Sequence, residues 1–354
     1  MSHELIIDGR TIGPDHPPYV IAELSGNHNG DIERAFALIA AAQASGADAV
    51  KLQTYTADTL TIDHHGPGFT VEGGLWAGRT LHSLYQEAHT PWDWHAALFA
   101  RGRELGITVF SSPFDPTAID FLENLKAPAY KIASFEIVDI PLIERAAATG
   151  KPLIMSTGMA DEQEIADAVA AARAAGDGGV ALLHCISSYP APAEDSNLRT
   201  IPLLEQTFDT VIGLSDHTPG TTVSIAAIAL GAAIIEKHVT LDRADGGVDS
   251  AFSLEPAELK TLCAESRTAW QALGSAGWGQ RQSETGSLKF RRSLYVVEDI
   301  PAGAQFSTAN VRSIRPGYGL PPKHLPDIIG RTATRDLARG EPLDWSMAAA
   351  TAQD

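Results

Sequence analysis

Short apolar runs alternate with stretches of helical periodicity from the start of the chain to Leu273. The runs are rich in Val, Ile, Leu and Ala and are bounded by polar residues, which is typical of strands buried on both faces of a parallel sheet. We predict strands of this kind at residues 19–24, 49–54, 108–113, 129–134, 153–157, 180–185, 210–215 and 234–238.

The stretches between these runs carry helix signals. Asp115 precedes Pro116 as an N-cap followed by a proline, Asp161 and Glu164 have capping-box spacing, and Gly46 ends an amphipathic segment. Eight strands separated by helical segments predict an α/β fold, a (β/α)8 TIM barrel. An open doubly wound sheet is the alternative. No G-x-G-x-x-G turn follows the first strand, which disfavours dinucleotide binding.

The composition changes near Gly274, where glycines alternate with Ser and Gln. This is typical of a linker. Beyond it the chain holds no long helical pattern. We therefore predict a barrel domain over residues 1–276, a linker over 277–290 and a small β-rich domain over 291–354.

Composition narrows the class of function. The chain has 26 basic and 44 acidic residues, a net charge of −18, which argues against a nucleic-acid partner. It has no apolar run of membrane-spanning length and no secretory signal pattern at its start, so we expect no membrane contact. Cys185 and Cys263 are the two cysteines, and so few favour a reducing cytoplasm.

Polar residues gather where the predicted strands end, which is where barrels bind their ligands. They are Glu23, Lys51, Gln53, Ser111, Ser112, Lys131, Ser134, Glu136, Ser156, Ser187, Tyr189, Asp216, His217, Glu236 and His238. Side chains alternate along a strand, so Lys51 shares a face with Gln53, and Glu236 with His238. Lys131 and Ser134 have opposite parity, which predicts that their strand ends or bulges near Ala133.

Lys51 and Lys131 lie in otherwise apolar strands, and a buried lysine costs several kcal/mol unless it is paired. Three interpretations remain open: ion pairs with Glu23 and Glu136, an anion site for phosphate or carboxylate, or a Schiff-base lysine. His217 and His238 end neighbouring predicted strands. Two neutral imidazoles there suit one divalent ion, although satisfied core histidines have the same pattern.

Two further features have two interpretations each. The long connection after residue 54 holds Trp76, Tyr85, Trp92 and Trp94, which could form a lid over the barrel or a packed outer layer. Arg315 lies in a predicted turn of the small domain. It is either a solvated surface residue or a group that reaches an anionic site on a barrel.

Seven ordered motifs together resemble the sialic acid synthase family: IAELSGNHNG at 21–30, VKLQT at 50–54, FSSPF at 110–114, YKIASFE at 130–136, MSTGM at 155–159, GLSDHT at 213–218 and IEKH at 235–238. RRSLY at 291–295 and RPG at 315–317 resemble its C-terminal antifreeze-like (SAF) domain. GGLW at 73–76 and LYQEAHTPWDWH at 84–95 are most similar to the branch of the family that makes pseudaminic acid.

The resemblance implies a transferase that condenses phosphoenolpyruvate with an open-chain N-acetylated amino sugar and releases phosphate. For the pseudaminic branch the sugar is a 2,4-diacetamido-2,4,6-trideoxy hexose of altro configuration. The resemblance also implies one divalent metal, Mn²⁺ or Mg²⁺, and a homodimer in which each SAF domain covers the partner's barrel. The product would serve the glycosylation of surface glycans or flagellin.

The matching positions imply residue roles. Glu23, Glu136, Glu236, Lys51 and Lys131 would line the reacting centre, with Glu23 or Glu136 as the general base. His217 and His238 would bind the metal. Phosphoenolpyruvate would contact Lys51, Ser112, Lys131, Ser134, Ser156 and Ser187, and the sugar would contact Gln53, Tyr189 and Arg315, the last from the other subunit. The alternatives are an N-acetylneuraminate or legionaminate synthase, a metal-free Schiff-base aldolase, and a non-catalytic sugar- or ice-binding protein.

Overall fold

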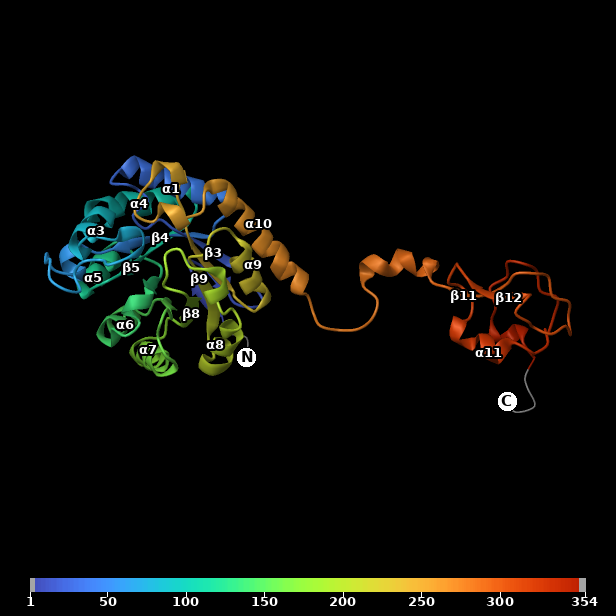
Figure 1. Cartoon of the computed structure of the whole chain (residues 1–354). Helices are drawn as coiled ribbons and strands as arrows, with labels where there is room; N and C mark the ends of the chain where they lie inside the picture. Colours follow the sequence, from blue (N-terminus) through green and yellow to red (C-terminus); the bar gives the residue numbers. More distant parts are fainter. Residues whose placement is uncertain (1–3, 350–354) are drawn as a thin grey trace. The chain divides into compact units, whose positions relative to one another are not determined.

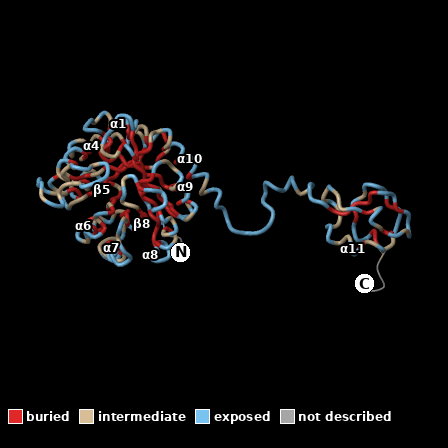
Figure 2. Tube along the Cα trace, in the orientation of Figure 1, coloured by how far each residue is buried: buried red, intermediate tan, exposed pale blue. Residues whose placement is uncertain are grey.

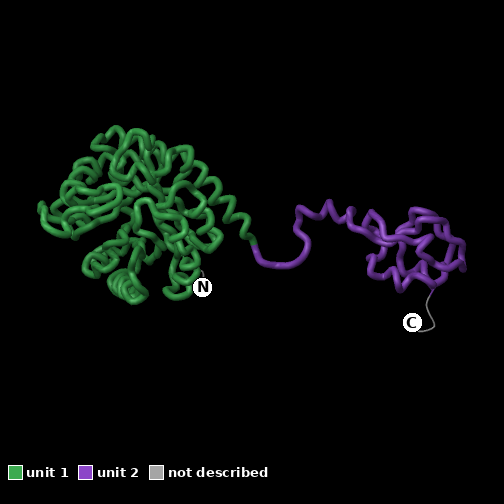
Figure 3. The backbone as a smooth tube through the Cα atoms, in the orientation of Figure 1, with its two compact units in different colours: residues 1–274 green, residues 275–354 purple. Residues whose placement is uncertain are grey.

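The computed structural model describes residues 4–349. The chain divides into two compact units, residues 1–274 and residues 275–354 (Figure 3). Residues of the expected linker lie in the second unit, where they include the 3-10 helix η6 (Gln282–Phe290). Among the described residues, no helix is long and apolar enough to cross a membrane.

The first unit is built on a barrel of parallel strands (Figure 1). The barrel is closed, and its strand order is β10-β3-β4-β5-β6-β7-β8-β9. This confirms the TIM-like barrel and excludes the open sheet. The strands are β3 (Tyr19–Glu23), β4 (Ala49–Thr54), β5 (Thr108–Pro113), β6 (Tyr130–Ile132), β7 (Leu153–Ser156), β8 (Val180–Cys185), β9 (Val211–Asp216) and β10 (Ile234–His238).

Helices surround the strands (Figure 1). They are α1 (Ile32–Ser45), α4 (Trp92–Leu105), α5 (Pro116–Asn124), α6 (Ile140–Ala147), α7 (Glu162–Ala175), α8 (Thr200–Phe208), α9 (Thr222–Ala229) and α10 (Pro256–Leu273). The predicted caps are present: Asp115 accepts a hydrogen bond from the Ala118 amide, and Asp161 and Glu164 form a capping box. The long connection after β4 holds α2 (Ala57–Leu60), η1 (Gly74–Trp76) and α3 (Leu81–Ala88).

Alternation along the strands separates two apolar layers. Side chains such as Val20, Leu52 and Ile235 face outward and pack with the helices, while Phe110 and Ile234 belong to a second cluster inside the barrel. Figure 2 shows this buried interior. Because the inner cluster lies toward the first residues of the strands, the last residues are free to be polar.

A hairpin that the hydrophobic pattern did not predict closes the end of the barrel where the parallel strands begin. Strands β1 (Leu5–Ile7) and β2 (Arg10–Ile12) pair antiparallel, and Leu5, Ile7 and Ile12 join the inner cluster. Burying one such aliphatic side chain is worth about 1.5–3 kcal/mol. The hairpin thus seals the end of the barrel opposite to the polar strand ends.

Strand β6 is shorter than the predicted 129–134 segment. It ends at Ile132, and the 3-10 helix η2 (Ser134–Glu136) follows at once. This is the break that the opposite parity of Lys131 and Ser134 required. The turn lets the chain present Ser134 and Glu136 near the end of the strand that carries Lys131.

The second unit has its own small core. Strands β11 (Ser293–Val296) and β12 (Val311–Ile314) pair antiparallel, followed by η7 (Pro322–His324), α11 (Leu325–Ile328) and η8 (Trp345–Met347). Leu294, Phe306 and Leu343 are among the buried residues that hold it together. The expectation of a small domain of short strands and irregular chain is met.

Candidate active site

The polar strand ends meet at one end of the barrel. Strand pairing places Lys51 beside Glu23, and Glu23 in turn beside His238. Strand β10 pairs with β9 along its other edge, which places Glu236 beside Ser215. All of these side chains are at least nine-tenths buried, although each is polar or charged. A barrel interior that accepts this many polar groups must pair them or offer them to a ligand.

Lys51 is held by two carboxylates. Its Nζ lies 3.1 Å from Glu23 Oε2 and 3.3 Å from Glu236 Oε1, and it donates to Ser112 Oγ at 3.3 Å. Burial opposes the charge on Lys51, but the two carboxylates outweigh it and raise the pKa of the ammonium. The predicted pairing of Lys51 with Glu23 is therefore present, and Lys51 is charged.

Lys131 has other partners than the sequence suggested. Its Nζ donates to Ser156 Oγ at 2.7 Å and to the Ile132 carbonyl at 3.1 Å, and lies 3.7 Å from Glu236 Oε1. The expected ion pair with Glu136 is absent from residues 4–349, because Glu236 is nearer. Burial lowers the pKa of Lys131, partly offset by the Glu236 charge.

The three glutamates differ in their environment. Burial raises the pKa of Glu23 against the pull of Lys51, and Gln53 Nε2 donates to Glu23 Oε1 at 2.8 Å. Burial also disfavours charge on Glu236, but Lys131 and Lys51 prevail and lower its pKa. Glu136 lacks such close cations, and burial raises its pKa to about 7. Its Oε2 atom is buried without a hydrogen-bond partner.

Serine hydroxyls complete the cationic side of the site. Ser134 Oγ lies 2.7 Å from Ser187 Oγ, and Gly158 lies against both. A Cβ on Gly158 would come within 2.5 Å of Ser134 Cβ and 2.9 Å of Ser187 Oγ, and the residue has a φ of +51°. Together with Ser112 and Ser156, these hydroxyls and the two ammoniums are donors of the kind that binds phosphate oxygens.

His217 and His238 lie side by side, with ring centroids 5.3 Å apart. His217 donates from Nδ1 to the Ile186 carbonyl at 2.9 Å, and His238 Nδ1 lies 3.2 Å from Ser25 Oγ. Burial lowers the pKa of His217 to about 4 and that of His238 well below its usual value, so both rings are neutral at pH 7.

These two rings fit a metal in their chemistry. A hydrogen bond at Nδ1 leaves the Nε2 lone pair for a metal ion, which is the usual arrangement of a ligating histidine. Within residues 4–349, no three His, Cys, Asp or Glu side chains are grouped as a complete metal site. The pair therefore offers two protein ligands, and water or substrate oxygens would have to supply the others.

Aromatic residues form one side of the site. The Tyr189 ring centroid lies 4.4 Å from that of His217 and 5.5 Å from that of Phe252, and the Trp76 centroid lies 5.7 Å from Tyr189. Phe252 also lies 5.0 Å from His238. Trp76 thus places its ring against a predicted site residue.

The remaining aromatic residues of that connection pack elsewhere. Trp92 stacks on Phe121 with ring centroids 4.8 Å apart, and Trp94 lies edge-on to His28 with centroids 5.5 Å apart. Tyr85 lies 5.9 Å from Tyr55. Trp92 and Trp94 thus belong to a packed outer layer, and Trp76 lies against Tyr189. The expected lid over the barrel stays a prediction.

Three site residues escaped the sequence analysis. Ser25 follows β3 with a positive φ of 42°, which turns its hydroxyl toward His238. Asp249 Oδ2 lies 3.9 Å from His238 Nδ1, and Phe252 packs on the same ring. Asp249 and Phe252 come from the loop between β10 and α10, where no periodic pattern or motif marks them.

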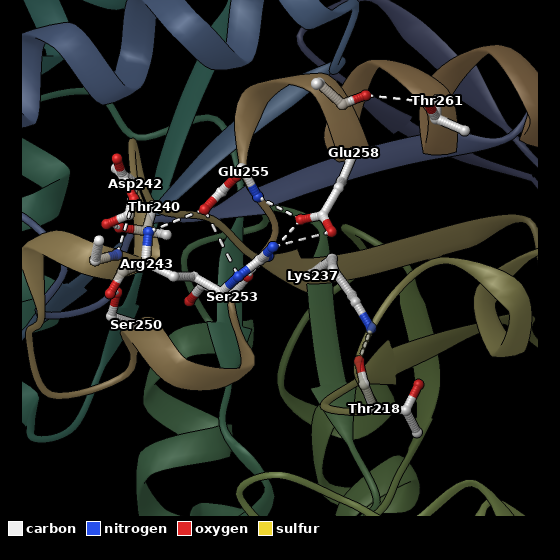
Figure 4. Close-up of polar contacts among 12 residues, drawn as sticks. Thr218, Lys237, Thr240, Asp242, Arg243, Ser250, Ser253, Glu255, Glu258 and Thr261 are labelled. Carbon is white, nitrogen blue, oxygen red and sulfur yellow. Dashed lines mark hydrogen bonds and ion pairs between the residues drawn. The ribbon is translucent and has the colours of Figure 1, made fainter.

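Arg243 braces that loop from outside. In Figure 4 its side chain lies between Glu255, Glu258 and Ser253. It forms ion pairs with both glutamates and donates to the Ser253 carbonyl at 3.1 Å. Lys237 lies on the outer face of β10. Its Nζ lies 2.8 Å from Oδ2 of Asp216, the last residue of β9, and donates to the Thr218 carbonyl. These contacts fix the chain on both sides of His217 and His238.

Arg315 is the one predicted site residue of the second unit. It is exposed and directly follows β12. Its predicted contact with the sugar of another subunit's barrel stays a prediction.

Comparisons with known proteins agree with this geometry. Residues 38–277 match the NeuB family, and residues 291–349 match the SAF domain. The chain is 42% identical to the pseudaminic acid synthase of Helicobacter pylori over 92% of this chain and 96% of the relative, and 36% identical to the N,N'-diacetyllegionaminic acid synthase of Legionella pneumophila over 92% and 93%.

Solved structures show the same relationship. The crystal structure of N-acetylneuraminic acid (sialic acid) synthetase from Leptospira borgpetersenii, in complex with citrate, is 33% identical, with a TM-score of 0.73 over 82% of this chain and 97% of that chain. The NeuB match spans most of the barrel unit, and the relatives cover nearly the whole chain. The chain therefore belongs to the NeuB family and carries a C-terminal SAF domain.

Proposed function

We propose that this chain is a pseudaminic acid synthase. It joins phosphoenolpyruvate, the open-chain aldehyde of 2,4-diacetamido-2,4,6-trideoxy-altropyranose and water, and yields pseudaminate and phosphate. Pseudaminic acid synthases are 41–42% identical to the chain, against 35–36% for the legionaminic acid synthases. The observation that carries the proposal is the meeting of two buried lysines with two neutral imidazoles at the polar end of the barrel.

Phosphoenolpyruvate would bind where the cations are. Lys51 and Lys131 are the buried ammoniums of the site, and the hydroxyls of Ser112, Ser134, Ser156 and Ser187 lie around them. In so buried a place, donors fixed in advance stabilise a phosphate far better than in water. The chain has a net charge of −18, so an anionic substrate needs such a local concentration of cations.

His217 and His238 would hold one divalent ion, Mn²⁺ or Mg²⁺, through Nε2. When bound there, such an ion supplies a Lewis acid for the aldehyde oxygen of the sugar. Tyr189 lies against His217, and Gln53 is anchored on Glu23. From these positions the two side chains would orient the sugar so that its carbonyl carbon faces C3 of phosphoenolpyruvate.

The reaction then needs one proton acceptor and one stabilised leaving group. C3 of phosphoenolpyruvate forms a bond to the aldehyde carbon, whose oxygen takes up a proton and becomes a hydroxyl. Water adds at the electron-poor C2, and its two protons end on that hydroxyl and on the departing phosphate. We assign the removal of the water proton to Glu136, since Glu23 is held by Lys51 and Gln53 while Glu136 Oε2 is unpartnered. The C2–O bond to phosphate breaks, leaving a 2-keto acid, and Lys51 and Lys131 balance the charge of the departing phosphate.

We further propose a homodimer in which the SAF domain of one subunit covers the barrel of its partner. The loops after β6 and β7 expose Phe135, Val138 and Met159 beside the site, and large exposed apolar side chains of this kind mark an interaction surface. The second unit exposes Tyr318 next to the Arg315 turn. Arg315 would then reach the sugar in the partner's barrel.

The proposed cellular setting follows from the reaction. The enzyme would act in the cytoplasm and supply pseudaminate for surface glycans or flagellin. Cys185 and Cys263 are both free and buried, as suits a reducing compartment.

A substrate panel with a phosphate readout tests the proposed function. The panel compares the altro diacetamido sugar, its legionaminate-type epimer and N-acetylmannosamine, each with phosphoenolpyruvate and Mn²⁺ or Mg²⁺. We expect the highest kcat/KM with the altro sugar. A higher kcat/KM with one of the other two would assign the chain to the corresponding synthase instead.

A further inference from the structure

The tip of the long connection after β4 is an ordered, hairpin-like loop. Thr70 and Thr80 form an antiparallel bridge, and backbone hydrogen bonds link Val71 to both Gly78 and Arg79. The 3-10 turn η1 stands at the end of this loop. A loop with its own backbone ladder can hold a side chain in a fixed place, unlike an unbonded segment.

Trp76 is the residue that this loop directs inward. Every other residue from Glu72 to Gly78 is exposed, whereas Trp76 is half-buried. Its indole Nε1 donates to the Val248 carbonyl at 2.9 Å, so the loop after β4 is tied to the loop after β10. Its ring then lies 5.7 Å from Tyr189.

The position of Trp76 extends an aromatic row. Trp76 lies against Tyr189, Tyr189 lies against both His217 and Phe252, and Phe252 lies against His238. The row starts at the imidazole pair, where the aldehyde end of the sugar would react. Trp76 is at the other end of the row, where the part of the sugar far from the reacting carbon would lie.

We propose that Trp76 is a specificity-determining residue whose indole forms an apolar wall for the distal part of the amino sugar. This inference deepens the proposed function and rests on it. A trideoxy diacetamido sugar presents methyl groups, which pack well on an aromatic face. N-acetylmannosamine has hydroxyls at the equivalent carbons, and a hydroxyl against the indole loses its hydrogen bonds to water without gaining others. A pocket of this kind discriminates by about 10- to 200-fold.

The test is the ratio of kcat/KM values for the altro diacetamido sugar and for N-acetylmannosamine, measured by phosphate release. Where N-acetylmannosamine is not turned over, its competitive Ki replaces the second value. The variants are Trp76→Ala, which removes the wall, and Trp76→Phe, which keeps an apolar ring but loses the hydrogen bond to Val248. Leu75→Ala is the matched control, because Leu75 is the neighbouring residue and is 49% exposed.

We expect Trp76→Ala to lower the ratio about 10-fold or more, with an unchanged KM for phosphoenolpyruvate. Trp76→Phe should keep most of the preference, and Leu75→Ala all of it. An unchanged ratio in Trp76→Ala, or equal losses for both sugars, would overturn the assignment of Trp76 while the proposed function stands. Failure of the unmodified enzyme to use the diacetamido sugar would overturn both.

Discussion

Glu236 Oε1 lies 3.3 Å from Lys51 Nζ and 3.7 Å from Lys131 Nζ, so one carboxylate oxygen bridges the two buried ammoniums. The three residues come from β10, β4 and β6, which are not neighbours in the barrel. Without this oxygen, two like charges would face each other in a dry interior. Glu236 thereby allows the two lysines to lie close together. An anion that carries more charge than the Glu236 carboxylate would interact more strongly with both.

Replacing Lys51 by Met tests the anion site. We expect kcat/KM for phosphoenolpyruvate to fall at least about 100-fold, because a fixed charge is lost where the phosphate leaves. Glu23 and Glu236 also lose their shared cation, which should cost about 3 kcal/mol of unfolding free energy. Steady-state kinetics and denaturant melts measure the two effects.

Lys151→Met is the matched control for Lys51→Met. Lys151 pairs with Glu123 in a partly exposed position away from the site. Such pairs contribute about 0–1 kcal/mol, so this variant should keep its activity and nearly all of its stability. Equal losses of activity in the two variants would refute a special role for Lys51.

Replacing Glu136 by Gln tests the general base. Burial raises the pKa of Glu136 to about 7, and a base works only when deprotonated. In the unmodified enzyme kcat/KM should therefore fall tenfold per pH unit as the pH drops below about 7. Glu136→Gln should lose most of its activity and that dependence on pH. If Glu136→Gln stayed active and its kcat/KM still fell at low pH, Glu23 would be the general base instead.

The same substitution has an opposite effect on stability. Because the pKa of Glu136 is higher in the folded chain than in the unfolded one, folding takes up a proton between pH 4.5 and about 7. Stability is therefore lost as the pH rises through this window. Glu136→Gln removes that loss. We therefore expect the free energy of unfolding of this variant at pH 8 to be higher than that of the unmodified chain by up to about 3 kcal/mol. Thermal or urea unfolding at pH 5 and pH 8 measures the difference.

Gly158→Ala tests the serine pair. Its Cβ would lie within 2.5 Å of Ser134 and 2.9 Å of Ser187, so the two hydroxyls must move apart. We expect a higher KM for phosphoenolpyruvate. Gly150→Ala is the control, because Gly150 also has a positive φ of +73° but meets only Asp177 at 3.7 Å. Both variants place an alanine at a positive φ, and a raised KM in both would mean that backbone strain alone is responsible.

Removing the metal tests the imidazole pair. Chelation should abolish phosphate release, and Mn²⁺ or Mg²⁺ should restore it. His217→Ala should weaken Mn²⁺ binding, followed by calorimetry, at least about tenfold. His184 is the control, since it is also buried but lies on the outer face of β8 and bonds to the Ser196 carbonyl at 2.7 Å. Full activity after chelation would contradict the metal assignment.

Lys131 allows a test of the rival aldolase mechanism. Burial lowers its pKa, a property that a Schiff-base lysine shares. Its amine, however, is occupied by Ser156, Ile132 and Glu236. We expect pyruvate and borohydride to leave Lys131 unmodified, as mass spectrometry of the digested protein would show. A pyruvate adduct on Lys131 or Lys51 would support the aldolase.

The alternation of side chains made much of the site predictable. It placed Lys51 with Gln53 and Glu236 with His238 on the inner face, and it required the break after Lys131 that the structure has at Ile132.

Contacts between distant segments were not predictable in this way. Nothing local marks Glu236 rather than Glu136 as the partner of Lys131, since the choice depends on the diameter and tilt of the barrel. Asp249 and Phe252 lie at the short 3-10 helix η5 (Ser250–Phe252), in a connection that Arg243 ties to the start of α10, and no periodic pattern marks them. The hairpin of β1 and β2 was missed because strands of three residues are too short to show a hydrophobic period.

The fate of the bridging oxygen of phosphoenolpyruvate tests the central claim most directly. The enzyme is incubated with Mn²⁺, the altro diacetamido sugar and phosphoenolpyruvate that carries ¹⁸O between C2 and phosphorus, and the released phosphate is analysed by mass spectrometry. Addition of water at C2 followed by C–O cleavage predicts that phosphate appears only when all three components are present and that it retains the label. Phosphate release without the sugar, or label left in the organic product, would contradict the account.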